Sequence, residues 1–366
     1  MTHYVSHDGF VKWLAGLTGQ GVFIPEPTAR GSWVRRLQAE LLTAPARQPA
    51  TAHLGGPGGG AVASPALDRP RASQSAKGFF MPPAETLGRY GENAGPAVAV
   101  AEEPVVIVGV RACELRAWRY LDKVMLEGPF VDPMYKARRE AATIIATDCV
   151  QCAPTCCCTL VDGRPFVESG DGADINVTPL ADGYVLDVLT EKGRALVGGA
   201  NWPEASAEQL AGRQTARQQM VEQLNKQNAE FSYRATDEKP PDLPEMEHEA
   251  WQRFAADCVE CGACTNICPT CYCFYLFDHI TNPGSAERVR TWDSCLLATY
   301  HRMAGGVAMK LTPRPELRNR LANRILHKFV YSPQQYGMLG CVGCGRCVDA
   351  CLGAIDIRKA VEGLKR

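Results

Sequence analysis

Residues 258–269 read Cys-Val-Glu-Cys-Gly-Ala-Cys-Thr-Asn-Ile-Cys-Pro, and residues 341–351 read Cys-Val-Gly-Cys-Gly-Arg-Cys-Val-Asp-Ala-Cys. In both stretches the cysteines stand at relative positions 0, 3, 6 and 10. This spacing is typical of a segment that binds a four-iron, four-sulfur ([4Fe–4S]) cluster, because the short gaps let a tight loop direct three thiolates at one cluster. The two stretches therefore predict a ferredoxin-type domain with two clusters.

The fourth cysteine of such a segment usually ligates the other segment's cluster. We therefore expect crossed ligand sets, which are Cys258, Cys261, Cys264 and Cys351 for one cluster and Cys341, Cys344, Cys347 and Cys268 for the other. Zinc is the main alternative. Zinc sites usually use paired Cys-x-x-Cys or Cys/His groups, whereas each segment here has an evenly spaced triplet and a fourth cysteine. Two such segments favour iron–sulfur ligation.

A further group of cysteines lies in residues 149–158, which hold five of the 17 cysteines of the chain. Cysteine is often buried as a small hydrophobe, but five in ten residues, beside Pro and Thr, is not core composition. In an extended segment, alternate side chains point the same way. We therefore expect a third [4Fe–4S] cluster, held by Cys113, Cys149, Cys156 and Cys158. The choice among Cys152, Cys156, Cys157 and Cys158 stays open, and zinc is the alternative metal.

Three cysteines remain outside these sets, namely Cys271, Cys273 and Cys295. Three thiols do not complete a four-cysteine site by themselves. Thiols near a cluster can tune its potential by hydrogen bonding, so packing, tuning and ligation all stay open for them. The seven histidines show no metal-ligand spacing.

Composition restricts the class of protein. The chain has 366 residues and a net charge of −1, so no basic field favours nucleic acid or an anionic membrane. An odd, high cysteine count argues for metal thiolates in a reducing compartment rather than disulfides. Residues 1–9 lack the basic start and apolar run of a signal peptide, and no uncharged apolar run could span a bilayer. We expect a cytoplasmic protein without a membrane span.

The chain divides into three parts by its patterns. Residues 1–200 predict an α+β domain, because buried β-branched runs at 104–110 and 141–147 and an alternating hairpin at 176–189 accompany short helices. Residues 201–246 predict a helical, proline-rich linker, with a helix over 205–231. Residues 247–366 predict the dicluster domain, which we expect to be mainly helical and α-helical ferredoxin-like.

Local features refine this division. Residues 5–18 predict a helix, whereas residues 30–42 could form a helix or a strand. Thr312 and Pro313 are expected to open a helix with an apolar stripe from Leu317 to Phe329. The arginines of this helix are Arg318, Arg320 and Arg324. We favour their interpretation as a solvated face over a role in docking an acidic partner.

Residues 43–75 are rich in Ala, Gly, Pro and Ser, which predicts a flexible surface loop. Its glycine run at 55–60 could suggest a phosphate loop. A phosphate loop needs a preceding strand and a following helix, and neither is visible, so we do not favour that interpretation.

Several stretches together resemble a known family of iron–sulfur subunits. They are Lys-Gly-Phe-Phe-Met-Pro at 77–82, Ile-Val-Gly-Val-Arg-Ala-Cys-Glu at 107–114, the cysteines of 148–158, residues 258–272, Arg-Thr-Trp-Asp-Ser-Cys at 290–295, and residues 340–351. In this order they resemble the β subunit of cytoplasmic sulfhydrogenases, which are nickel–iron hydrogenases with sulfur-reductase activity, and the corresponding iron–sulfur subunit of anaerobic sulfite reductase. The similarity covers roughly residues 77–358. The chain departs from the pattern at Cys152 and Cys157, in one added residue between Cys149 and Cys156, in the glycine-rich stretch and at Leu352.

The resemblance implies an electron-transfer subunit with several [4Fe–4S] clusters, the third at Cys113, Cys149, Cys156 and Cys158. It implies two partners, namely a flavin-containing NAD(P)H-oxidising subunit, together with a hydrogenase, reductase or further iron–sulfur subunit. No flavin is expected on this chain. Two other hypotheses are kept, a sulfur- or disulfide-reducing enzyme with a substrate-facing cluster near Cys113 and Cys149, and a redox sensor or nucleic-acid processor, against which the near-zero charge argues.

Overall fold

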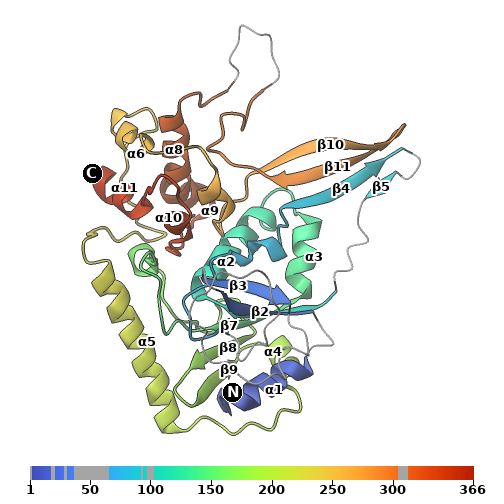
Figure 1. Ribbon diagram of the computed structural model, residues 1–366, viewed down its shortest axis with the longest axis vertical. Coiled ribbons are helices and arrows are strands. Elements are labelled where there is room, and N and C mark those ends of the chain that lie inside the picture. The colour runs from blue at the N-terminus through green and yellow to red at the C-terminus, as the bar shows by residue number, and fades with distance from the viewer. Residues whose placement is uncertain are drawn as a thin grey trace, which may run out of the picture.

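A computed structural model describes residues 2–17, 21–28, 31–36, 66–91, 94–96, 103–303 and 312–366 (Figure 1). The N-terminal half contains a seven-stranded sheet in the order β1-β9-β8-β7-β6-β2-β3. Its strands are β1 (Thr2–Ser6), β2 (Gly21–Thr28), β3 (Gly31–Arg36), β6 (Val105–Val110), β7 (Ala142–Thr147), β8 (Ile175–Pro179) and β9 (Gly183–Val188). The pairs from β2 through β6 and β7 to β8 are parallel, and the outer pairs are antiparallel.

Helices cover both faces of this sheet, because its central strands are buried runs of β-branched residues. Val106, Val108 and Ile145 pack on one face with α1 (His7–Gly16) and α4 (Glu191–Val197). Ile107 and Ile144 pack on the other face with α2 (Ala112–Met125) and α3 (Pro133–Ala141). These elements confirm the predicted strands at 104–110 and 141–147, the hairpin at 176–189 and the first helix.

A second sheet joins the two halves of the chain. Its order is β10-β11-β4-β5, and its strands are β4 (Ala84–Tyr90), β5 (Gly95–Pro96), β10 (Phe274–Asn282) and β11 (Ser285–Trp292). The β10–β11 hairpin extends from the cluster-bearing half as an arm, and β4 pairs along it (Figure 1). Arg290 of β11 forms ion pairs with Glu85 of β4 at 2.5 Å and with Asp132. This hairpin was not among the predicted elements.

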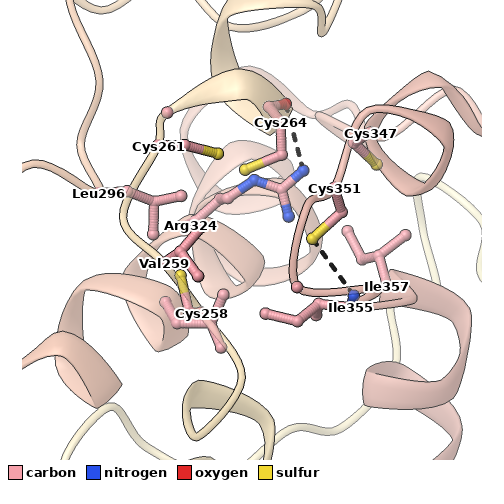
Figure 2. A pocket seen from close by; sticks show the side chains of 13 residues that line it. Cys258, Val259, Cys261, Cys264, Leu296, Arg324, Cys347, Cys351, Ile355 and Ile357 are labelled. Carbon is pink, nitrogen blue, oxygen red and sulfur yellow. Dashed lines mark hydrogen bonds between the residues drawn. The ribbon is translucent and has the colours of Figure 1, made fainter.

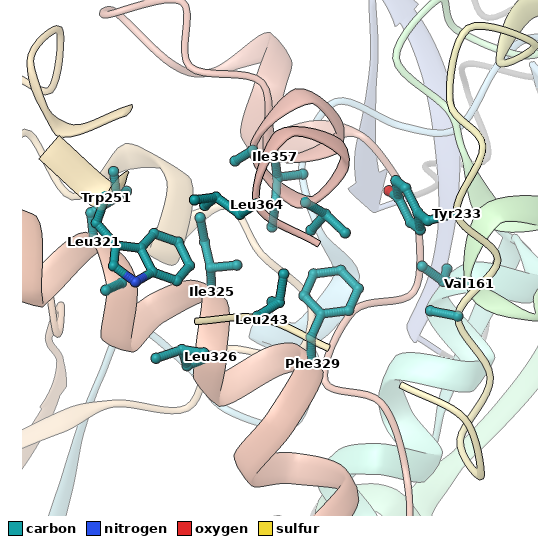
Figure 3. Close-up of a cluster of buried hydrophobic side chains, with 14 of the residues drawn as sticks. Val161, Tyr233, Leu243, Trp251, Leu321, Ile325, Leu326, Phe329, Ile357 and Leu364 are labelled. Carbon is teal, nitrogen blue, oxygen red and sulfur yellow. The ribbon is translucent and has the colours of Figure 1, made fainter. Parts of the chain in front are cut away.

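The C-terminal part contains short helices around a common core. They are η4 (Glu249–Trp251), α6 (Gln252–Ala255), α7 (Ala263–Asn266), α8 (Leu317–Leu326), the π-helical turn η5 (His327–Tyr331), α9 (Ser332–Tyr336), α10 (Arg346–Asp349) and α11 (Ile357–Leu364). Trp251, Ile325 and Phe329 are fully buried in this core (Figure 3). Because the hairpin interrupts these helices, the prediction of a mainly helical domain is not confirmed, and an α/β region followed by a domain of mixed elements describes the chain.

Several local predictions differ from the structure. Helix α8 begins at Leu317 with Glu316 as its N-cap, not at Thr312 and Pro313. The stretch at 30–42 contains strand β3. Residues 43–65, with the glycine run, lie outside the described residues. In the remaining part of the expected flexible loop, residues 66–75, the buried side chains are those of Ala66, Leu67, Arg71 and Ser75. Leu67 there is fully buried, and its carbonyl oxygen accepts a hydrogen bond from Arg111 at 2.8 Å.

The expected linker also takes part in the core of the C-terminal helices. Its helix α5 (Ala207–Gln227) runs along one side of the molecule (Figure 1). Outside the linker, the chain also contains two short 3₁₀ turns, η2 (Ala76–Phe79) and η3 (Cys158–Val161). Phe231, Tyr233 and Leu243, which follow α5, are buried in the core of the C-terminal helices. The boundaries at 200 and 246 stay predictions, since this segment packs against the elements on both sides of it.

Candidate iron–sulfur sites

The two cysteine segments fold into matching loops. In each loop the residue before the second cysteine has a positive φ, 53° at Glu260 and 64° at Gly343, and so does the following glycine, 69° at Gly262 and 73° at Gly345. These left-handed residues turn the chain sharply between consecutive cysteines. A short helix follows each loop and carries the third cysteine, α7 with Cys264 and α10 with Cys347. The fourth cysteine comes directly after the helix.

The first site combines three cysteines of one segment with the last cysteine of the other. Cys258, Cys261, Cys264 and Cys351 line one opening together with Arg324 (Figure 2). The backbone N–H of Ile355 donates a hydrogen bond to the Cys351 sulfur at 3.2 Å. Burial raises the pKa of Cys258, so this thiol keeps its proton until a metal binds, and a bound metal deprotonates a coordinating thiol. The structure thus brings the first predicted ligand set together.

The second site lies deeper. Cys268 and Cys344 are 7% and 8% exposed. Burial, together with the nearby charges of Cys268, Cys344 and Cys341 and against Arg324, raises the pKa of Cys347 to about 12. Cys268 therefore lies near the other segment's triplet, and its role as the crossing ligand stays a prediction.

A lysine contacts this second set directly. Lys328 is 4% exposed and donates hydrogen bonds to the Cys268 sulfur at 3.2 Å, to the Thr270 hydroxyl at 2.9 Å and to the Gly340 carbonyl at 3.1 Å. Burial opposes its charge, but Cys268 and Cys271 raise the pKa of Lys328 well above its ordinary value. A buried ammonium of this kind requires nearby negative charge.

The third site forms where two parallel strands end. Strand β6 leads into α2, whose first turn carries Cys113, and β7 leads into Asp148 and Cys149. A second opening is lined by Cys113, Cys149, Cys152, Cys156, Cys158 and Cys344, among others. Burial, ahead of neighbouring charges, raises the pKa of Cys149 to about 11. The four predicted ligands are therefore gathered, with Cys152 beside them.

Two of the doubtful cysteines have distinct surroundings. The Cys152 thiol donates a hydrogen bond to the side-chain oxygen of Gln227 at 3.2 Å. Cys157 packs in the core of the C-terminal helices, whereas Cys156 and Cys158 pack around the third site. The alternation expected for residues 156–158 is confirmed, although ligand choice at this site stays a prediction.

A buried network fixes the end of β7. Asp148 is 1% exposed, and its carboxylate accepts hydrogen bonds from Val167 N at 2.9 Å, Thr178 Oγ1 at 2.6 Å and Arg217 Nε at 2.7 Å. Arg217 lies on α5, so this ion pair ties that helix to the strand end that carries Cys149. The network holds Asp148, the neighbour of Cys149 in the chain, in place.

The second and third sites share a tight boundary. A Cβ on Gly343 would meet Cys157 and Cys158, and a Cβ on Gly345 would meet Thr155, so the second cysteine loop lies directly against residues 155–158. The carbonyl oxygen of Gly343 also accepts a hydrogen bond from Cys157 N at 2.8 Å. The backbones at these two sites are in van der Waals contact.

Buried arginines occupy the spaces between the sites, and the sequence interpretation missed them. Arg346 is 2% exposed and pairs with Glu114 at 2.5 Å. Arg71, 7% exposed, pairs with Asp349 at 2.6 Å and donates to the Cys344 carbonyl. Arg324 is 5% exposed and lies near Cys264 and Cys347, whose negative charges, against burial, raise its pKa.

The interpretation of the α8 arginines as a solvated face is wrong for two of the three. Arg320 and Arg324 are buried, and Arg320 donates to the Leu296 carbonyl at 2.9 Å and pairs with Glu260 at 2.7 Å. In the sequence, only the positions of Arg320 and Arg324 pointed to their burial. They flank the apolar stripe of a helix that lies against two cysteine segments, where negative charge is expected.

Two other kinds of feature are absent from the described ranges. Among those residues, no three His, Cys, Asp or Glu side chains stand close enough to hold a single metal ion. Likewise, none of the helices that the structure describes is long and apolar enough to cross a membrane.

Comparison with known proteins agrees with the dicluster prediction. Residues 257–355 match the family model described as a 4Fe-4S dicluster domain, which supports two [4Fe–4S] clusters. The chain is 29% identical over 301 residues to sulfhydrogenase 2 subunit beta of Pyrococcus furiosus, an alignment that covers 82% of this chain and 85% of that protein. No solved structure matches the chain.

Proposed function

We propose that the chain is an iron–sulfur subunit of the same family as the sulfhydrogenase β subunit, and that it relays electrons between two partners. The match of residues 257–355 to a 4Fe-4S dicluster domain and the 29% identity to sulfhydrogenase 2 subunit beta support this proposal. One partner would be a flavin-containing NAD(P)H-oxidising subunit, and the other a catalytic or further iron–sulfur subunit. The catalytic partner would be of the hydrogenase, sulfur or sulfite reductase, or heterodisulfide-reductase type. The complex would work in the cytoplasm, and the flavin would be on the partner rather than on this chain.

We assign three ligand sets to three [4Fe–4S] clusters: Cys258, Cys261, Cys264 and Cys351 at the first site, Cys341, Cys344, Cys347 and Cys268 at the second, and Cys113, Cys149, Cys156 and Cys158 at the third. Each bound cluster would accept and donate one electron at a time. The thiol donor sets and the openings between them at the first and third sites fit such groups.

One observation carries the relay most directly. The segment 341–351 takes part in all three sites, since Gly343 and Cys344 line the third opening and Cys347 and Cys351 line the first. Cys344 itself belongs to the second set. The sites therefore follow one another along a single segment, third to second to first, and each neighbouring pair shares chain from this segment.

The buried cations suit this role. Arg346 lies between the second and third sites, and Arg324 lies between the first and second. A positive charge beside a group that gains an electron stabilises the reduced form. These side chains would therefore stabilise the negative charge of reduced clusters in a buried relay, without any bond to substrate.

The test compares the isolated chain with the complex purified from native extract under anaerobic conditions. The isolated chain is expected to bleach with dithionite but not with NADH or NADPH, and the complex to bleach with the nicotinamide. Copurification of a flavin-containing subunit is also expected. Bound flavin in the isolated chain, or its direct reduction by NAD(P)H, would contradict the proposal.

A second candidate function is reduction of a sulfur compound at the third site. A polar cleft beside that site reaches Cys113 and Cys158, so a small polar substrate would have access to these two thiols. Its arginines, Arg116, Arg119 and Arg164, are paired with the aspartates Asp171 and Asp237 of the same cleft. The isolated chain with reduced methyl viologen is expected to turn over sulfite, polysulfide or a disulfide under this alternative. The absence of turnover with all three would exclude it.

A further inference from the structure

One buried arginine of helix α8 lacks a carboxylate partner. Arg324 is 5% exposed, and within the described part of the chain it forms no ion pair with an Asp or Glu side chain. Its Nε is buried without a hydrogen-bond partner among the described residues. A terminal nitrogen of its guanidinium donates one long hydrogen bond, at 3.4 Å, to the Cys264 carbonyl oxygen. A buried guanidinium in these surroundings requires negative charge from another group.

The other buried arginines are balanced by groups of the chain itself. Most of them form ion pairs with carboxylates, namely Arg71, Arg290, Arg320, Arg346 and Arg358. Arg111 instead donates hydrogen bonds to carbonyl oxygens, among them that of Asp148 at 2.7 Å and that of Leu67 at 2.8 Å. Among the arginines that the structure describes as buried, Arg324 is therefore the one whose charge is left for the cysteine sites to balance.

Arg324 faces ligands of two proposed sets. Its side chain points into the first opening, which Cys264 and Cys351 also line (Figure 2). Cys347, a proposed ligand of the second site, lines the same opening. Burial alone would lower the pKa of Arg324, but negative charge on Cys264 and Cys347 raises it well above its ordinary value. The guanidinium therefore stays charged beside both proposed sites.

We propose that Arg324 is a potential-setting residue shared by the first and second clusters, so that one buried charge couples their reduction potentials. The proposal rests on the ligand sets assigned under the proposed function. A positive charge beside a group that gains an electron favours the reduced form of that group. Because the same guanidinium lies beside both sets, a change at Arg324 acts on both clusters together.

Lys328, which follows on the same helical stretch, is a cation that serves one site. Its ammonium donates hydrogen bonds to the Cys268 sulfur at 3.2 Å and to the Gly340 carbonyl oxygen at 3.1 Å, both at the second site. Lys328 is not among the described residues that line the first opening. Removal of its charge should therefore act on the second cluster far more than on the first, which distinguishes Lys328 from Arg324.

The competing interpretation gives Arg324 a structural role alone. Its hydrogen bond to the Cys264 carbonyl oxygen would then hold α8 against the first cysteine loop. Under that interpretation, a neutral side chain that keeps the helix in place would leave both reduction potentials unchanged. Reduction potentials therefore separate the two interpretations, because they respond to the charge around a cluster.

The test titrates the full chain, purified anaerobically, with redox mediators and follows the electron paramagnetic resonance signals of the first and second clusters. Arg324→Gln keeps N–H donors and removes the charge. We expect it to shift both midpoint potentials to more negative values, each by at least a tenfold change in the redox equilibrium constant, which is about 59 mV for one electron. A shift in one signal alone, or in neither, would overturn the proposal. The titration needs no partner subunit, so its outcome is independent of whether the chain relays electrons between partners.

Further variants complete the test. Arg318→Gln is the matched control, since Arg318 lies on the same helix and pairs with Glu316, and it should shift neither potential. Lys328→Met should shift the second potential alone. If Arg324→Gln holds neither cluster, Arg324→Lys, which keeps the charge, decides between the interpretations. Recovery of both signals in Arg324→Lys is expected, and recovery of one signal alone, or of neither, would overturn the proposal.

Discussion

Gly345 and Gly262 occupy equivalent positions in the two cysteine loops, with φ of 73° and 69°. They differ in what surrounds them. A Cβ on Gly345 would overlap the backbone of Thr155, whereas a Cβ on Gly262 would lie 3.3 Å from the Ser294 side chain. The absence of a Cβ at Gly345 therefore allows the close contact between the second and third sites, whereas Gly262 is needed only for the turn in its own loop.

This difference gives the first prediction. Gly262→Ala should cost about 1–2 kcal/mol of stability, the cost of a left-handed non-glycine residue. Gly345→Ala should cost more, because backbone must also move, and it should lower iron occupancy at both the second and third sites. Anaerobic unfolding midpoints with iron content measure both effects. Equal losses in the two variants would contradict the close packing of residues 155–158 against this loop.

Lys328 gives the second prediction at this scale. Its ammonium lies 3.2 Å from the Cys268 sulfur. Lys328→Met should lower the reduction potential of the second cluster by about 60–130 mV, since a hydrogen bond to a charged group contributes about 1.5–3 kcal/mol and 59 mV corresponds to a tenfold change for one electron. Redox titration followed by electron paramagnetic resonance measures it. The exposed Lys226→Met is the control and should leave all potentials unchanged.

Residue spacing predicted a dicluster domain, which the family match over residues 257–355 supports, because cluster geometry leaves little freedom in the loop that carries three ligands. The individual ligand sets stay predictions. The buried cations could not be predicted in the same way. Arg320 and Arg324 sit on α8 like ordinary surface residues, and only the packing of that helix against Cys264 and Leu296 encloses them. Burial of a charge depends on a distant partner, which local pattern does not contain.

Helix α5 shows what a single contact does for an element. The helix is polar, and Met220 and Leu224 are its only buried residues among those described. Leu224 lines the third opening, and Arg217 pairs with Asp148 at 2.7 Å. The helix therefore covers the third site through a small number of side chains, so the loss of one of them should weaken the site.

Asp148→Ala gives the prediction for this element. The change leaves Arg217 without its buried carboxylate, and breaking one side of a buried pair typically costs about 3–5 kcal/mol. The third site should lose iron before the first and second sites do. Glu222→Ala on the exposed side of α5 should change stability by less than about 0.5 kcal/mol. Retention of full iron content and stability by Asp148→Ala would show that α5 is not needed to close the site.

At the element scale, sequence predicted strands better than their partners. The β-branched runs at 105–110 and 142–147 form β6 and β7, because burial on both faces requires such residues. The pairing of β11 with β4 was not predictable, since the paired residues lie about 200 positions apart in the chain and no short turn connects the two strands. Non-local pairing of this kind joins the two halves of the chain.

At the scale of the whole molecule, the halves meet at the clusters. The third site takes Cys113, Cys149, Cys156 and Cys158 from the N-terminal half and places them against Gly343 and Cys344 of the C-terminal half. In the proposed ligand sets, the first and second sites exchange Cys268 and Cys351. The proposed order of the three sites could be inferred only after the loops were placed in space.

The exchange of ligands gives a prediction about cooperativity. Cys268→Ala should disturb the second cluster, held by Cys341, Cys344 and Cys347, more than the first cluster, although Cys268 belongs to the first segment. Separate electron paramagnetic resonance signals of the two clusters, assigned with Cys351→Ala as the reciprocal variant, measure this. The reverse pattern would show that each segment binds its own cluster.

The central claim is a relay of three [4Fe–4S] clusters in one chain, and iron and acid-labile sulfide content of the anaerobically purified protein tests it most directly. We predict about twelve irons and twelve sulfides per chain, four of each per cluster, falling to about eight in Cys113→Ser while the signals of the first and second clusters persist. About eight irons in the wild-type chain, unchanged by Cys113→Ser, would contradict the claim.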